Sequence, residues 1–129
     1  MSKEKPVVMV IEDESLLLEA IVTKLEHSEF EVVSFTNGGK ALDYLQSNPR
    51  LPDIIWLDYY LTDMNGLEFM QSVKANSKWA SIQVFVISNS ASPEKVKNML
   101  ALGAKKYILK AEYRLDQIVD LLREFLKDA

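Results

Sequence analysis

The stretch PDIIWLDYYLTDMNG, residues 52–66, is the segment of the sequence that decides the fold. Residues 54–57 are all apolar, and a strand without polar alternation is typical of a parallel sheet that is covered on both faces. The run ends directly at Asp58, and carboxylates are almost never fully buried without a partner. We therefore expect this strand to hold Asp58 at the edge of the sheet, beside groups that balance its charge.

Short apolar runs lie on both sides of this strand and alternate with segments of helical spacing. The runs cover residues 7–11, 31–35, 84–87 and 107–109. The runs at 7–11 and 84–87 predict central strands, whereas the shorter or more mixed runs at 31–35 and 107–109 predict edge strands. Five strands alternating with five helices predict an α/β domain, with a doubly wound, five-stranded parallel sheet.

The helical segments also indicate how each helix begins and which side chains face inward. We expect Ser15 to cap the first helix, and Ser92 to cap the fourth, with Pro93 in its first turn and Gly103 at its end. The remaining helices are expected near residues 39–45, 67–73 and 115–126. The predicted inward side chains are Leu17, Ile21 and Leu25 in the first helix, and Val96, Met99 and Leu100 in the fourth.

The composition excludes several classes of protein. The 129 residues fit a single domain, which we expect to span residues 1–129. The chain has no Cys and one His, His27, which excludes disulfides, a cysteine nucleophile and a multi-histidine metal site. A net charge of −4 argues against nucleic-acid binding, and no apolar run approaches the ~20 residues of a membrane helix. Since the N-terminus does not read as a signal peptide, we expect a cytoplasmic protein.

Polar side chains follow four of the predicted strands. Glu12 and Asp13 follow the first strand, Asp58 the third, Ser88 the fourth and Lys110 the fifth. Right-handed crossovers bring these strand ends to one rim, where the ligands of such sheets bind. Clustered carboxylates repel unless a cation lies among them, and Mg²⁺ takes one or two carboxylates together with phosphate oxygens. Because a carboxylate can act as a nucleophile, the set predicts Mg²⁺-assisted phosphoryl transfer to Asp58.

Four sequence blocks resemble the signature blocks of response-regulator receiver domains from two-component signalling systems. They are VMVIEDES at residues 8–15, PDIIWLDYYLTDMNG at 52–66, VFVISNS at 84–90 and ALGAKKYILK at 101–110, and NGGKAL at 37–42 resembles the start of the second helix of that family. The blocks occur in the family's order and at its spacing. The resemblance implies the flavodoxin-like receiver fold, with strand order 2-1-3-4-5, in a stand-alone, chemotaxis-regulator-like receiver.

The resemblance also implies a role for each candidate residue. Asp58 is then the phospho-acceptor, and Mg²⁺ is held by Glu12, Asp13, Asp58 and the backbone carbonyl of Tyr60. Ser88 and Lys110 contact the attached phosphoryl group, and Tyr107 is an aromatic switch that turns inward as Ser88 moves.

The implied phosphodonor is a sensor histidine kinase or a histidine phosphotransfer protein. The implied output is a changed surface on the last two helices and the last strand, read by an unknown partner. Such a domain catalyses only its own phosphorylation and dephosphorylation and is not otherwise an enzyme.

The chain departs from the family pattern near this rim. Ala111 stands where the family usually has Pro, so we expect a trans peptide bond there, with a shifted loop. Asn89 stands where the family usually has a small residue, and it is expected to narrow the access to Asp58. Tyr60 and Ser90 occupy the two positions that tune dephosphorylation in the family.

Three other classes of protein compete with an active receiver. A phosphatase of the haloacid dehalogenase type needs a second Asp two residues after the nucleophile, where this chain has Tyr60. In a flavodoxin-like flavin binder, the phosphate loop follows the first strand, where Glu12 and Asp13 would repel a phosphate. A degenerate receiver, folded but not phosphorylated, would act as a constitutive interaction module. The presence of all the chemistry-bearing residues favours the active switch.

Two surface hypotheses follow from the charge and apolar patterns. A phosphorylation-promoted homodimer would pair an acidic face of the last helix with a basic patch on the fourth helix, and a solvated face is the plainer interpretation of both. The acidic residues are Asp116, Asp120 and Glu124, and the basic ones are Lys95 and Lys97. Leu16 and Leu18 both lie off the predicted inward face of the first helix, and we expect Leu18 to contribute to docking of the phosphodonor.

Overall fold

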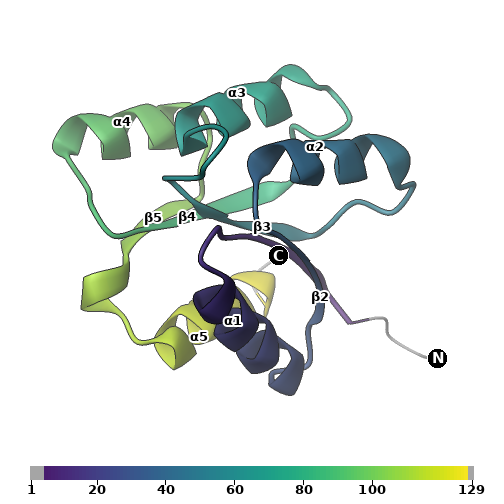
Figure 1. Cartoon of the computed structure of the whole chain (residues 1–129), viewed down its shortest axis with the longest axis vertical. Coiled ribbons are helices and arrows are strands. Elements are labelled where there is room, and N and C mark those ends of the chain that lie inside the picture. Colours follow the sequence, from purple (N-terminus) through teal and green to yellow (C-terminus); the bar gives the residue numbers. More distant parts are fainter. Residues whose placement is uncertain (1–4, 128–129) are drawn as a thin grey trace.

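The computed structural model describes residues 5–127, which form one five-stranded parallel sheet with helices on both faces (Figure 1). The strands are β1 (Val7–Ile11), β2 (Glu31–Phe35), β3 (Ile54–Asp58), β4 (Gln83–Ser88) and β5 (Lys106–Leu109). The helices are α1 (Ser15–His27), α2 (Gly38–Ser47), α3 (Gly66–Ala75), α4 (Pro93–Ala101) and α5 (Leu115–Lys127). The strand order is β2-β1-β3-β4-β5, as predicted.

The sheet separates two hydrophobic cores. Helices α1 and α5 cover one face, and α2, α3 and α4 cover the other (Figure 1). Alternate residues of β3 enter each core, because side chains of a strand point to opposite faces in turn: Ile55 and Leu57 pack toward α2–α4, whereas Ile54 and Trp56 pack toward α1 and α5. Burial on both faces explains why residues 54–57 of β3 are all apolar, and β1 and the middle of β4 repeat the pattern.

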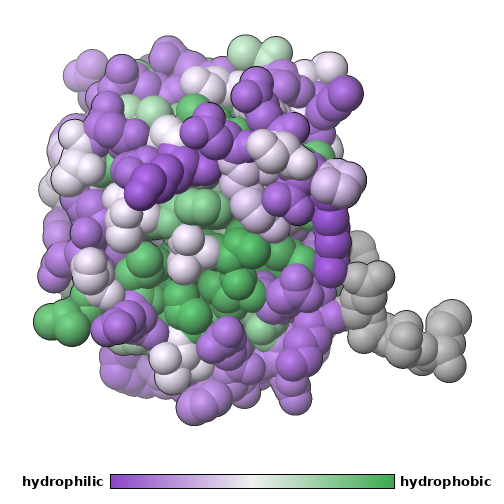
Figure 2. All heavy atoms as spheres, turned by 45° about the vertical axis from the view of Figure 1, so that its right-hand side comes forward, coloured by the Kyte–Doolittle hydropathy of each residue, from purple (hydrophilic) through white to green (hydrophobic). Residues whose placement is uncertain are grey.

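The edge strands are the mixed ones, as their sequences predicted. The residues of β2 are either exposed or half-buried, and β5 also has a mixed pattern. On the side of the molecule that carries β2 and α1, Figure 2 shows a continuous hydrophobic area between hydrophilic rims.

Within residues 5–127, none of the helices has both the length and the apolar character needed to cross a bilayer.

Helix caps set the loops beside the rim. The predicted cap Ser92 accepts a hydrogen bond from the backbone N–H of Lys95, and Pro93 stands in the first turn of α4. At α3, Asn65 and Glu68 form a reciprocal capping box. The prediction for α1 was wrong, because Glu14 is the N-cap there and makes no side-chain cap hydrogen bond.

Two apolar positions differ from their predicted faces. Leu18 is buried in the core beneath α1, whereas Leu16 is 81% exposed, so Leu18 cannot be the docking residue. Leu100 and Met99 were both expected inside; Met99 is fully buried, as predicted, but Leu100 is 46% exposed. The buried face of each helix is thus displaced or narrower than predicted. His27 is exposed at the end of α1, while Trp56 and Trp79 are buried packing residues.

Candidate functional site

The pairing of β1 with β3 brings three carboxylates together at one rim of the sheet. Ile11 pairs with Leu57, so the residues that follow these two positions are neighbours in space. Glu12, Asp13 and Asp58 each offer an oxygen atom, and these atoms lie within 4.8 Å of one another. Glu12 and Asp58 are buried and Asp13 is half-buried. The three carboxylates among the predicted metal ligands therefore lie together, as expected from the strand ends.

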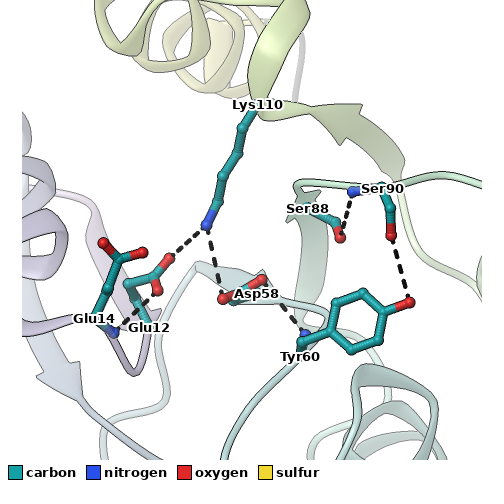
Figure 3. A network of polar contacts seen from close by, with 7 residues as sticks. All are labelled: Glu12, Glu14, Asp58, Tyr60, Ser88, Ser90 and Lys110. Atoms are coloured by element: carbon teal, nitrogen blue, oxygen red, sulfur yellow. Dashed lines mark hydrogen bonds and ion pairs between the residues drawn. The ribbon is translucent and has the colours of Figure 1, made fainter.

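Lys110 reaches this cluster from the end of β5, on the opposite side of β4 (Figure 3). Its Nζ lies 2.9 Å from Oε1 of Glu12 and 3.7 Å from Oδ2 of Asp58. The ammonium group is thus shared, with its shorter contact to Glu12. The other carboxylate oxygen of Glu12 accepts a hydrogen bond from the backbone N–H of Glu14 at 3.2 Å. Glu12 is held at both oxygens, which explains how a carboxylate only 1% exposed is accommodated.

The environment makes ionisation of Asp58 costly. Burial is the largest cause and the charge of Glu12 the second, and together they raise the pKa of Asp58 to about 7, against the opposing effect of Lys110. When every group is ionised, three carboxylates against one ammonium leave a local charge of −3 + 1 = −2. One divalent cation balances this charge.

The oxygen atoms gathered at this rim are ligands of the kind that Mg²⁺ prefers. Mg²⁺ prefers oxygen ligands and is commonly bound through one or two carboxylates with several retained waters. Glu12, Asp13 and Asp58 offer three hard oxygens from two strand ends, in a pocket with an uncompensated negative charge. The backbone of Tyr60 follows at once, and its N–H lies 3.5 Å from Oδ1 of Asp58. When bound there, Mg²⁺ would supply positive charge to the oxygens of an incoming phosphate.

Ser90 contacts Ser88 and Tyr60 on the other side of Asp58 (Figure 3), and it also contacts Tyr107. Its backbone N–H donates to Oγ of Ser88 at 3.3 Å, and its hydroxyl donates to the hydroxyl of Tyr60 at 3.4 Å. Its carbonyl oxygen accepts from the hydroxyl of Tyr107 at 2.7 Å. Ser88, at the end of β4, is fully buried, whereas Tyr107 is half-buried, and burial raises the pKa of Tyr107. All the predicted site residues therefore lie around one rim.

Two contacts near the rim were not predicted from the sequence. The carboxylate of Asp63, in the loop after β3, accepts from the backbone N–H groups of Gly38 and Gly39 at 3.0 and 2.8 Å. It thereby binds the first turn of α2, where free N–H groups favour an anion. Lys95 places its Nζ 4.5 Å from the ring centroid of Tyr60. Neither partner is near in sequence, so no spacing pattern could have identified these contacts.

The departures from the family pattern lie in exposed loops. Ala111 belongs to a short 3₁₀ turn, Lys110–Glu112, and no peptide bond in the described part of the chain is cis, in line with the predicted trans bond. Asn89 is exposed near the end of β4, and its predicted effect on access to Asp58 stays a prediction.

The charged residues of the proposed interface are partly in place. The exposed ones are Lys97 on α4, and Asp120 and Glu124 on α5, as either a solvated face or an interface would require.

The comparison with known proteins identifies the class. The model of the response regulator receiver domain family matches residues 8–123. The two-component response regulator ORR11 of rice (Oryza sativa subsp. indica) is 32% identical over 105 residues, which are 81% of this chain and 71% of that protein. The transcriptional regulatory protein CitT of Halalkalibacterium halodurans is 31% identical over 107 residues, which are 80% of this chain and 45% of CitT. The chain belongs to the family of response regulator receiver domains.

Solved structures agree in fold. A CheY-like receiver domain protein from Methanospirillum hungatei superposes with a TM-score of 0.85 at 20% identity, covering 96% of this chain and 95% of that one. The phosphorylated cyanobacterial phytochrome response regulator RcpA superposes with a TM-score of 0.80 at 25% identity, covering 94% and 91%. The fold and its strand order are thus those of a CheY-like receiver, a signalling domain rather than a classical enzyme.

Proposed function

We propose that this protein is a phosphorylation-dependent switch that accepts a phosphoryl group on Asp58. The supporting observation is the shared ammonium of Lys110: its Nζ lies 3.7 Å from Asp58, at a rim where three carboxylates gather within 4.8 Å. A structural ion pair needs one carboxylate for each lysine. Three carboxylates around one lysine leave a net negative charge, which suits a site that is completed by Mg²⁺ and a phosphoryl group.

The proposed metal ligands are Glu12, Asp13, Asp58 and the backbone carbonyl of Tyr60. Asp58 is the nucleophile: one of its carboxylate oxygens attacks phosphorus, the P–N bond of a donor phosphohistidine breaks, and its electron pair stays on the imidazole nitrogen, which then takes a proton. With a small acyl phosphate, the P–O bond breaks and carboxylate leaves. The domain contributes position and charge, and the donor supplies the energy of the bond.

Three side chains would respond to the new phosphoryl group. Lys110 would exchange its contact with Glu12 for a phosphoryl oxygen, and the hydroxyl of Ser88 would donate to another. When Ser88 moves, the N–H of Ser90 would lose its acceptor, and the hydrogen bond that the Tyr107 hydroxyl donates to the Ser90 carbonyl would be disturbed in turn. An inward turn of Tyr107 would then carry the change to the surface of α4, β5 and α5.

The proposed partners follow from the same assignment. The donor is a sensor histidine kinase or a histidine phosphotransfer protein, and an unknown output partner reads the surface of α4, β5 and α5. We place this activity in a single receiver domain spanning residues 1–129, in the cytoplasm. A phosphorylation-promoted homodimer through the same surface is part of the proposal, and sedimentation of the phosphorylated form tests it: a monomer at high concentration would exclude it.

The test is incubation with acetyl phosphate and Mg²⁺, followed by intact-mass spectrometry. One phosphoryl adduct is expected, and it is expected to disappear in Asp58→Ala and without Mg²⁺. The matched control is Asp63→Ala, because Asp63 lies five positions further along the chain, in the loop after β3, and accepts hydrogen bonds from backbone N–H groups of α2. This variant should keep the adduct.

A degenerate receiver is the competing function. The exposed Asn89 and the replacement of the usual Pro by Ala111 are the features that favour it. If the folded wild-type protein takes up no phosphoryl group, the proposed switch is wrong, and a constitutive interaction module becomes the better assignment.

A further inference from the structure

Lys95 occupies an unusual position for a cation. It lies in the first turn of α4, where the helix dipole favours negative charge and its backbone N–H is already bound to the cap, Ser92. Its side chain is half-buried, whereas that of Lys97 on the same helix is exposed. A lysine that is placed against the dipole and partly withdrawn from water needs a compensating contact.

Two tyrosines beside Asp58 provide that contact. The Nζ of Lys95 lies 4.5 Å from the ring centroid of Tyr60 and 5.3 Å from that of Tyr59. The two rings meet edge to face, with their centroids 4.9 Å apart. A cation within about 6 Å of an aromatic face is attracted by the ring quadrupole. Because Tyr59 is buried and fixed, the contact fixes the partly exposed ring of Tyr60 as well.

The far end of the Tyr60 ring is also held. Its hydroxyl accepts from Oγ of Ser90 at 3.4 Å, and the ring runs from the Asp58 end of β3 toward Ser90 (Figure 3). Tyr60 is therefore bound at three points: to Asp58 through its backbone, to Ser90 through its hydroxyl, and to α4 through Lys95. The bond to Ser90 belongs to a network that also includes Ser88 and Tyr107, whereas the contact with Lys95 comes from α4.

We propose that Lys95 is a positioning residue that holds the Tyr60 ring as a cover on the α4 side of Asp58, so that α4 controls how fast phosphoryl groups enter and leave. The inference rests on the proposed function of Asp58. In hydrolysis, a water oxygen attacks phosphorus, the P–O bond to Asp58 breaks, its electron pair returns to the carboxylate, and the water proton passes to solvent. A ring held over this side excludes the attacking water and impedes bulky donors.

The experiment compares Lys95→Met with Lys95→Arg and with Lys97→Met. Methionine keeps the length of the side chain and removes the charge, and arginine keeps a cation that stacks on aromatic rings. Lys97→Met is the control for loss of a charge from α4. Removing a cation from the first turn does not weaken the helix, so all three variants are expected to fold.

The first measurement is the rate of phosphoryl loss at fixed Mg²⁺. Lys95→Met is expected to lose the group about two- to fivefold faster, the factor that corresponds to about 0.5–1 kcal/mol of cation–π interaction. Lys95→Arg is expected to restore the wild-type rate, and Lys97→Met to leave it unchanged. The second measurement is the rate of phosphoryl uptake from two donors. Relative to wild type, Lys95→Met should be accelerated more with acetyl phosphate than with the smaller phosphoramidate.

The outcomes separate the two proposals. Equal rates in Lys95→Met and Lys97→Met, in a protein that is phosphorylated normally, would overturn the role of Lys95 and leave the switch intact. A Lys95→Arg variant as fast as Lys95→Met would also overturn it, because the cation would then be irrelevant. If the wild-type protein takes up no phosphoryl group, the proposed function fails, and the role of Lys95 fails with it.

Discussion

Replacing Asp58 by Asn is expected to stabilise the protein in the absence of Mg²⁺ at neutral and alkaline pH. The buried carboxylate lies beside Glu12 and shares one lysine with it, and this environment raises the pKa of Asp58 from its ordinary value of 3.8 to about 7. The folded state therefore binds the proton of Asp58 more tightly than the unfolded state does. An amide, which is always neutral, avoids the cost of ionisation.

The sign and size follow from this difference in pKa. The stability that the protonated group contributes is fully present below pH 3.8 and is lost as the pH rises to about 7. Each pH unit between these values is worth about 1.4 kcal/mol, so the complete effect is about 4 kcal/mol. Relaxation around the charge reduces it, and we expect Asp58→Asn to gain about 2–4 kcal/mol at pH 8 and almost nothing at pH 4.

The assay is urea unfolding of both proteins at pH 4, 6 and 8 in EDTA, with Asp43→Asn as the control for an exposed carboxylate on α2. A gain that grows between pH 4 and pH 8 in Asp58→Asn alone supports the reasoning. Equal stability of wild type and Asp58→Asn at pH 8 would refute it. A gain of the same size at pH 4 and pH 8 would also refute it, since ionisation would then not be its cause.

Three further changes test other parts of the structure. Asp13→Asn is expected to abolish the rise in melting temperature that Mg²⁺ gives the wild-type protein, measured by calorimetry across a Mg²⁺ series. Asp63→Ala removes the acceptor for two N–H groups of α2 and should cost about 1 kcal/mol in urea unfolding. Burial raises the pKa of Asp63 slightly, but the hydrogen bonds from the N–H groups of α2 lower it by more, so the pKa is lower in the folded protein. The loss of unfolding free energy should therefore shrink as the pH falls. Leu16→Ala should slow transfer from the cognate donor about fivefold and leave acetyl phosphate uptake unchanged, whereas no slowing would exclude Leu16 from the docking surface.

The strands were predictable because their signal is local and strong. A run such as residues 54–57 has no polar face, so only a position between two layers of helices can bury it. The gathering of polar side chains at one rim could be predicted from the topology, because parallel strands end at the same rim. Asp58 ends a strand, and Asp13 and Lys110 each follow one. These predictions needed no knowledge of side-chain conformation.

The phase of the helices was harder to predict. Residues 16–18 are three consecutive leucines, and they spread over more than half of the helix circumference, so the spacing rule does not choose among them. The structure buries Leu18 and exposes Leu16. On α4, Met99 and Leu100 are adjacent and of similar hydrophobicity, and the sheet beneath decides that Met99 is the buried one. Packing against a distant element settled both cases.

The contact between Glu12 and Lys110 could not be predicted either, and it changes how the rim is understood. The two residues are 98 positions apart, and a Glu side chain is one methylene longer than an Asp side chain. Its extra length allows a 2.9 Å contact with Lys110, closer than the 3.7 Å contact that Asp58 makes. Asp58 is thus left with the longer of the two contacts that Lys110 makes with a carboxylate.

That unequal sharing links stability to reactivity. A carboxylate with a raised pKa is a stronger nucleophile once it is ionised, but near pH 7 it is protonated for part of the time. A cation bound among Glu12, Asp13 and Asp58 would remove the proton and would also compete with Lys110 for Glu12. The lysine released in this way is the group that a new phosphoryl oxygen needs. Under the proposed function, the same crowding of charge that costs folding energy in the metal-free protein would therefore prepare both the nucleophile and its counter-ion for the transfer.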